Sequence, residues 1–170
     1  IYNATAAGAV PAVSMALTTG KTSSTLIATG ANTYMVVVNG TDTLKLYDGA
    51  VWTSVATFNA GAYSTAQLSF VETYRQRLYF AQRNSLILTY LAVNTFPALG
   101  STLVTYDLGA LFRQGGYIVS LGTWTIDGGT GPEDQLAIAS SKGEVAVFSG
   151  SDPSSASTWS LRGIYYIGKP

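Results

Sequence analysis

Short apolar runs separated by turn residues follow one another along most of the chain. The runs are rich in Val, Ile, Leu, Tyr and Thr, and Gly, Asn, Asp and Ser stand between them. This pattern predicts β-strands joined by short turns. Three segments repeat one hairpin design: TYMVVV-NGTD-TLKLYDG (33–49), RLYFA-QRN-SLILTYL (77–91) and QLAIA-SSKG-EVAVFSG (135–150). We therefore expect an all-β chain organised around three antiparallel hairpins.

Each hairpin is flanked by a further strand-like run on either side, which gives three units of four strands. The units cover about 25–57, 67–107 and 117–167, after an irregular leader over 1–24. The predicted strands are Thr25–Thr29, Thr33–Val38, Thr43–Tyr47 and Trp52–Thr57; Gln67–Thr73, Arg77–Ala81, Ser85–Leu91 and Thr102–Asp107; and Tyr117–Thr125, Gln135–Ser140, Glu144–Phe148 and Trp159–Ile167.

The spacing of the units indicates a repeat. Tyr34, Leu78 and Leu136 hold comparable positions in their hairpins, 44 and then 58 residues apart. Propeller blades repeat about every 40–50 residues, and insertions fall in loops. We assign the extra length of the third unit to a loop over TIDGGTGPED (125–134), and the only helix candidate is a short turn around 109–114.

The middle strands are apolar on both faces, as in Leu78 and Phe80 against Tyr79 and Ala81. Sheets buried on both faces show this pattern, and propeller blades are packed in this way. The predicted fold is therefore propeller-like, with about three four-stranded antiparallel blades forming a single segment over 1–170. Three blades do not close a propeller of about four to eight. The chain also begins at Ile1 without Met and ends soon after a strand-like run, so we expect a fragment of a larger propeller.

Two tryptophans occupy similar places in the first and third units. YDGAVWT and FSGSDPSSASTW both give an aromatic residue, a glycine, a loop and a tryptophan, Trp52 or Trp159. We predict that each tryptophan begins the fourth strand of its unit with its ring largely buried. On this interpretation the Ser-rich loop before Trp159 is only a spacer.

The amino-acid composition excludes several classes of function. Charged residues make up 11%, with nine basic and nine acidic side chains, so a phosphate-neutralising patch for nucleic acid is not expected. The absence of His and Cys excludes histidine-based triads within this chain and thiolate metal sites. Apolar runs are shorter than the roughly 18 residues of a membrane span, and the Ala-rich start lacks the basic region of a signal peptide, so we predict no membrane insertion.

The candidate sites have simpler explanations, and we predict no catalytic, metal or cofactor residue. Asp127, Glu133 and Asp134 lie on a Gly-rich loop and offer oxygen ligands for Ca²⁺, but their spacing is not that of an EF-hand, so a turn is expected. GKTSS (20–24) lacks the upstream glycine of a phosphate loop.

A glycosidase is the enzyme alternative, because YDGAVWT and SDPSSASTW are similar to the Asp-box hairpins of sialidase propellers. Such an enzyme needs a pair of catalytic groups, usually two carboxylates, facing one pocket. The arginines expected to hold a carboxylate are few: Arg75, Arg77, Arg83, Arg113 and Arg162. Eleven Tyr and three Trp offer a sugar-binding platform, although most alternate with aliphatic residues inside strands and are better explained by core packing.

Three stretches of the sequence resemble a family of tailed-phage and prophage virion proteins. They are RLYFAQRNSLILTYLAV, NGTDTLKLYDGAVWT, and the long segment from DLGALFRQGGYIVSLGTW to STWSLRGIYYIG. Together the resemblance extends over roughly Thr33 to Gly168, with Ser151 where the family pattern has Thr. The family is similar to the tail nozzle, or tail tubular, component of short-tailed phages.

The resemblance implies a structural role and no enzymatic activity. It implies a virion tail component, assembled in the host cytoplasm, in a ring of copies (a hexamer in the family) below the portal and around the DNA exit channel. The partners would be copies of the chain and other tail, portal or adaptor proteins, with DNA as passing cargo during ejection. The alternative is a receptor- or carbohydrate-binding propeller of a virion or a cell-surface adhesin.

Overall fold

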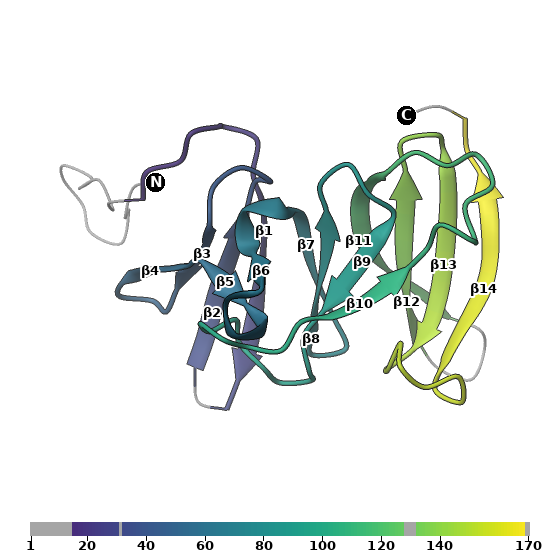
Figure 1. The fold of residues 1–170 in the computed structure, drawn as a ribbon. Helices are drawn as coiled ribbons and strands as arrows, with labels where there is room; N and C mark the ends of the chain where they lie inside the picture. Colours follow the sequence, from purple (N-terminus) through teal and green to yellow (C-terminus); the bar gives the residue numbers. More distant parts are fainter. Residues whose placement is uncertain (1–14, 31, 128–131, 169–170) are drawn as a thin grey trace, which may run out of the picture.

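A computed structural model describes residues 15–30, 32–127 and 132–168 and contains three four-stranded antiparallel sheets (Figure 1). Each sheet is a meander whose strands follow chain order, so the prediction of an all-β chain with three four-stranded antiparallel units is confirmed. A two-stranded ribbon and two short 3₁₀ turns join the first sheet to the second. The described residues include no helix long and apolar enough to cross a membrane.

The strand bounds lie within a few residues of the predicted ones. The first sheet contains β1 (Ser23–Thr29), β2 (Asn32–Val38), β3 (Leu44–Tyr47) and β4 (Trp52–Val55). The second contains β7 (Leu68–Tyr74), β8 (Arg77–Gln82), β9 (Ile87–Tyr90) and β10 (Val104–Asp107). The third contains β11 (Ile118–Asp127), β12 (Pro132–Ser140), β13 (Glu144–Gly150) and β14 (Trp159–Tyr166). The ribbon is formed by β5 (Thr57–Phe58) and β6 (Tyr63–Ser64), with the 3₁₀ turns η1 (Asn59–Gly61) and η2 (Thr65–Gln67).

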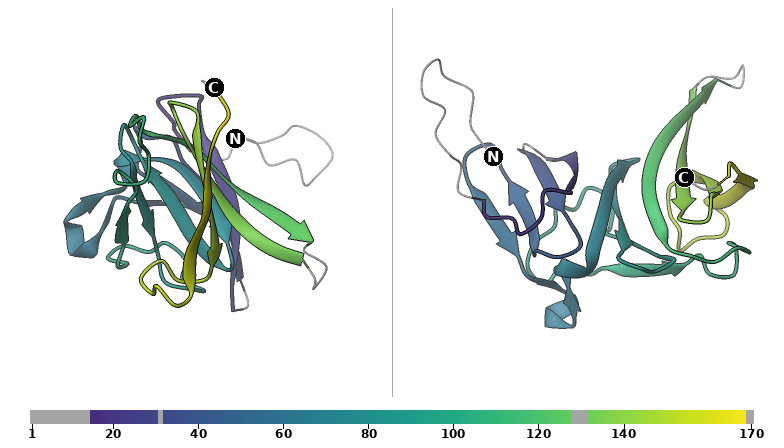
Figure 2. Two further views of the ribbon diagram at one scale, coloured as in Figure 1. Left: turned by 90° about the vertical axis from the view of Figure 1, so that its right-hand side faces the viewer. Right: turned by 90° about the horizontal axis from the view of Figure 1, so that it is seen from above.

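The three sheets lie beside one another in chain order, with the second between the other two (Figure 2). The first strand of each sheet is close to the first two strands of the sheet before it. Thus β7 contacts β1 and β2, and β11 contacts β7 and β8. The same spatial relation therefore takes the first sheet to the second and the second to the third.

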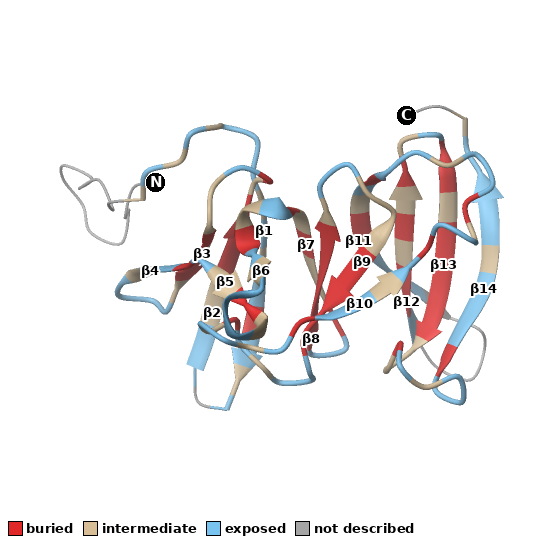
Figure 3. Ribbon diagram, viewed as in Figure 1, coloured by how far each residue is buried: buried red, intermediate tan, exposed pale blue. Residues whose placement is uncertain are grey.

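Strand β8 is buried on both faces, as its sequence predicts, and it separates two apolar cores (Figure 3). Leu78 and Phe80 point into the first core, which the second sheet shares with the first. Tyr79 and Ala81 point into the second core, which it shares with the third sheet. The alternation of side chains along one strand thus holds three sheets together.

Hydroxyl side chains fasten β1 to β7. Ser23 Oγ donates to the carbonyl of Val71 (3.2 Å) and accepts from its N–H (3.0 Å). Thr25 Oγ1 donates to Thr73 Oγ1 (3.1 Å), and Thr73 Oγ1 donates to the carbonyl of Leu26 (2.8 Å). These bonds fix the position of the two sheets relative to each other. Burial of apolar area is non-directional and does not by itself specify that position.

One local prediction is wrong. The segment 125–134 is mostly strand rather than loop, because β11 continues to Asp127 and β12 starts at Pro132, with 128–131 outside the described residues. The segment 109–114 forms the expected short turns and does not extend into a helix. Buried Glu144 accepts the N–H groups of Arg113 and Gln114 (3.1 and 2.8 Å), so a carboxylate from the third sheet satisfies backbone donors that a helix would have used.

The comparison of Tyr34 with Leu136 is wrong by one residue. Met35 pairs with Tyr47 across β2 and β3, and Leu136 pairs with Phe148 across β12 and β13, so Met35 is the register equivalent of Leu136. Tyr34 instead packs against the first core. A shift of one residue moves a side chain to the other face of a sheet, and sequence spacing alone does not reveal such a shift.

Candidate functional site

An aromatic cluster joins the second and third sheets. Trp159 begins β14, as predicted, and its ring is 7% exposed. It stacks on Phe148 of β13 (centroids 4.9 Å apart, 14° between planes) and on Tyr79 of β8 (6.0 Å, 13°). Tyr74 of β7 meets it edge-on at 6.4 Å. The prediction that Trp159 is a buried anchor is confirmed. Its ring packs against the second sheet as well as against its own, so it joins the two sheets.

Trp52 begins β4, also as predicted, and it is buried less completely than Trp159, although its Nε1 is buried. Its ring stacks on Tyr47 at 4.9 Å and is only half-buried. Trp52 pairs directly with Tyr47, which lies on the face of the first sheet that points away from the second. Within the described chain no sheet covers that face, so the ring lacks the partners that bury Trp159.

The Ser-rich loop 151–158 closes tightly at its base. The N–H of Ser151 donates to the carbonyl of Thr158 (3.0 Å), and Gly150 pairs with Trp159. Gly150 has φ +117°, and a Cβ added there would collide with the carbonyl oxygen of Thr158. The loop therefore requires glycine at this position.

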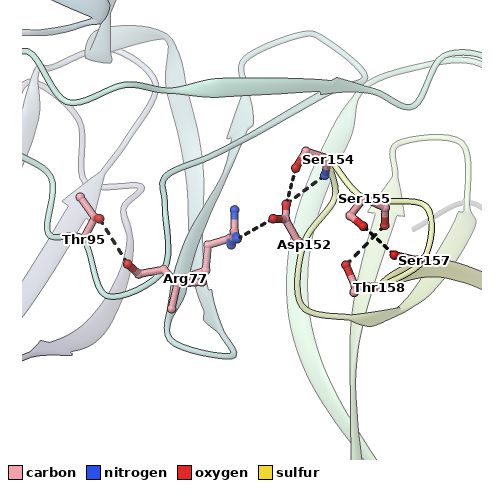
Figure 4. Close-up of polar contacts among 8 residues, drawn as sticks. Arg77, Thr95, Asp152, Ser154, Ser155, Ser157 and Thr158 are labelled. Atoms are coloured by element: carbon pink, nitrogen blue, oxygen red, sulfur yellow. Dashed lines mark hydrogen bonds and ion pairs between the residues drawn. The ribbon is translucent and has the colours of Figure 1, made fainter.

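Serine hydroxyl and backbone groups hold the loop in a defined turn (Figure 4). Asp152 Oδ1 accepts from the N–H (3.0 Å) and Oγ (2.7 Å) of Ser154. The N–H of Ser155 donates to the carbonyl of Asp152 (3.0 Å), and the Oγ atoms of Ser155 and Ser157 lie 2.9 Å apart. The hydrogen bonds from Ser154, with a smaller contribution from Arg77, lower the pKa of Asp152, so its carboxylate is ionised at neutral pH.

Arg77 connects this loop to the second sheet. Its guanidinium lies 3.6 Å from Asp152 Oδ2 (Figure 4). The guanidinium also lies over the ring of Tyr90 at 5.1 Å, and the residue is buried. Pro153 in the loop is also buried. The interpretation of the loop as a mere spacer is therefore wrong, because the loop is ordered by its own hydrogen bonds and attached to the neighbouring sheet.

Two of the three acidic residues considered for Ca²⁺, Glu133 and Asp134, contact other side chains. Asp134 Oδ1 accepts from Thr125 (2.7 Å), and Glu133 lies 3.8 Å from Arg162 in an exposed ion pair. No group of three potential metal-ligating side chains occurs in the part of the chain that the structure describes. The side chain of Asp127 lies outside the described part.

The Asp-box-like segments place their aspartates in turns, and Asp48 also lines a cavity of about 320 Å³ with Tyr34 and Phe96. Asp48 Oδ1 accepts from the N–H groups of Val51 and Ala50 (2.7 and 2.8 Å), and these bonds lower its pKa, as those from Ser154 do for Asp152. A general acid needs a raised pKa. Burial raises the pKa of Glu72, but no carboxylate among the described residues contributes to this shift.

The remaining candidates are also built into the scaffold. Ser23, within GKTSS, belongs to β1 and bonds to β7. Arg75 contacts the carbonyl of Asp134 (3.4 Å), while Arg83 lies on the exposed turn after β8. The cavity of about 450 Å³ beside residues 15–20 is lined by aliphatic, methionine, threonine, serine and glycine residues, without a carboxylate or an aromatic ring.

The ion pair between Arg77 and Asp152 was not predictable from the sequence. An arginine at the start of an apolar strand is usually assigned to solvent, and the two residues are far apart in the chain. Comparison with known proteins adds no information, because no family model, curated protein or solved structure matches the chain.

Proposed function

We propose that the chain is a structural component of a phage tail, of the nozzle or hub type, and forms part of a ring around the DNA exit channel. The observation that carries the proposal is the stacking of three sheets joined by aromatic rings, hydroxyl bonds and the buried Arg77. This construction suits a part whose task is to keep its shape under load, because close-packed interiors deform little.

We also propose that the three sheets are consecutive blades of a β-propeller. The repeated relation between neighbouring sheets, first strand against first and second strands, supports this architecture. Propeller blades are four-stranded antiparallel sheets packed face to face around an axis. The sequence resemblance supports the tail assignment, and copies of the chain with other tail proteins would form the ring.

Exposed aromatic side chains favour the alternative of a receptor- or carbohydrate-binding surface. Trp124 and Tyr165 are each more than half exposed on one face of the third sheet, and Tyr166 is more than half exposed on the other face. Sugar-binding sites use such rings, but they also need polar groups arranged around the ring.

Quantitative proteomics and immunogold labelling of purified virions test the tail proposal. We expect the chain in intact particles at a fixed stoichiometry, with label confined to the tail below the capsid. Its absence from purified virions, or label on distal fibres together with binding to a glycan array, would contradict the nozzle role.

A further inference from the structure

The outer faces of the first and third sheets each carry a group of apolar side chains among polar ones. On the first sheet one row crosses all four strands and is apolar throughout: Leu26, Met35, Tyr47 and Trp52. On the third sheet the outer face carries the small, aliphatic or aromatic residues Gly122, Trp124, Ala137, Ala139, Val145, Val147, Gly163 and Tyr165, beside the polar residues Ser120, Glu133, Gln135, Ser149, Ser160 and Arg162. Both faces lack a neighbouring sheet in the described chain.

Trp124 on the third sheet holds the place of Tyr74 on the second. Tyr74 pairs with Arg77 at the start of the second strand of its sheet, and Trp124 pairs with Gln135 in the same part of the next sheet. Both point toward the side on which a following sheet would lie. Tyr74 is 1% exposed because Trp159 of the following sheet covers it, whereas Trp124 is 54% exposed.

The Tyr47–Trp52 pair on the first sheet corresponds to the Phe148–Trp159 pair on the third. In each case the two rings stack with centroids 4.9 Å apart, although Trp52 lies directly opposite its partner and Trp159 lies opposite Gly150. Phe148 and Trp159 face the preceding sheet. Tyr47 and Trp52 face the side on which a preceding sheet would lie.

We propose that a second copy of this chain covers both faces, with Trp124 of one copy against the Tyr47–Trp52 pair of the other. This contact continues the interface already formed between the second and third sheets, and it involves different faces of the two copies. Contacts of this head-to-tail type form closed rings when the rotation closes. Two copies together contribute six sheets. Closed propellers have about four to eight blades, and six is the only multiple of three in that range.

The charges and the neighbouring segments permit this contact. Arg162 and Glu133 on the outer face of the third sheet form an ion pair with each other, and Lys45 on the first sheet donates to Ser54 (2.8 Å). The segment 15–20 lies over the β1–β2 part of the first sheet, where Thr18 bonds to Asp42 in the β2–β3 turn. Tyr47 and Trp52 lie at the opposite end of the strands.

Sedimentation velocity over a range of concentrations tests the proposal independently of any role in a virion. The wild-type chain should form particles of two chains. Trp124→Ala and Leu26→Asp, which change exposed side chains on the two opposite faces, should each raise the dissociation constant at least tenfold while circular dichroism stays unchanged. Tyr166→Ala is the control, because Tyr166 is 63% exposed but lies on the other face of the third sheet, and it should associate like the wild type.

A mixture of the Trp124→Ala and Leu26→Asp variants distinguishes the head-to-tail contact from a symmetric one. Each mixed pair retains one intact contact, so two-chain particles should reappear that neither variant forms alone. A wild-type chain that stays monomeric at all concentrations, an association that both variants leave unchanged, or the lack of recovery in the mixture would overturn the proposal.

Discussion

Replacing Trp159 by alanine measures how strongly the aromatic joint holds the second and third sheets together. A buried tryptophan removes about 200 Å² from water, which at about 25 cal/mol per Å² sets an upper bound of about 5 kcal/mol. Trp159 is 7% exposed and contacts three rings, so most of this value applies. Its Nε1 is buried without a hydrogen-bond partner, and removing that penalty returns about 1 kcal/mol. We expect Trp159→Ala to lower the free energy of unfolding by about 3–4 kcal/mol.

Urea unfolding followed by far-UV circular dichroism, at a concentration where the chain is monomeric, gives this value. Trp52→Ala is the matched control, because Trp52 begins the equivalent strand but is half-buried against one ring, and it should cost about 1–2 kcal/mol. Equal costs for the two variants, or a cost below about 1 kcal/mol for Trp159→Ala, would refute the assignment of Trp159 as the inter-sheet anchor.

Three further changes test neighbouring parts of the joint. Gly150→Ala should destabilise by at least about 2 kcal/mol in thermal or urea unfolding, and clearly more than Gly49→Ala, since both glycines have positive φ but only Gly150 faces a collision. Tyr79→Phe should be neutral or stabilising at pH 7, because the buried hydroxyl has no hydrogen-bond partner. Burial raises the pKa of Tyr79 above its ordinary 10.0. The wild type should therefore lose stability as the pH rises past 10, and the variant should lose less. The pKa of Asp152 is lowered from 3.8, so its stabilising contribution is present above that pH and lost below it. Asp152→Asn should therefore show a smaller fall in melting temperature between about pH 5 and pH 2.5 than the wild type. A fall equal to that of the wild type would argue against the carboxylate's role.

Hydrophobic periodicity and turn residues were enough to predict the three four-stranded units. The starts of β4, β13 and β14 agree with the predicted residues, because each strand begins directly after a turn rich in Gly, Asp or Ser. The start of β8 at Arg77 also agrees, although the turn before it is formed by Arg75 and Gln76. The double-sided burial of β8 was also predictable, since Leu78–Ala81 has no polar position that could face solvent.

The features that were not predicted depend on contacts between distant residues. The carboxylate of Glu144 reaches backbone groups about 30 residues earlier, and Asp152 reaches Arg77 in another sheet. The face on which Tyr34 lies depends on hairpin register, which shifts by one residue without an obvious change in the apolar pattern. Trp52 and Trp159 have similar local sequences, and they differ in burial because only Trp159 has a neighbouring sheet to cover it.

Cryo-electron microscopy of the intact virion tail, averaged around the tail axis, tests the proposed function most directly. The account predicts copies of this chain in a ring around a central channel, with stacked four-stranded sheets that match β1–β4, β7–β10 and β11–β14 in the map. A tail map whose channel-lining ring is built entirely from other chains, or one that places this chain only on peripheral fibres, would contradict it.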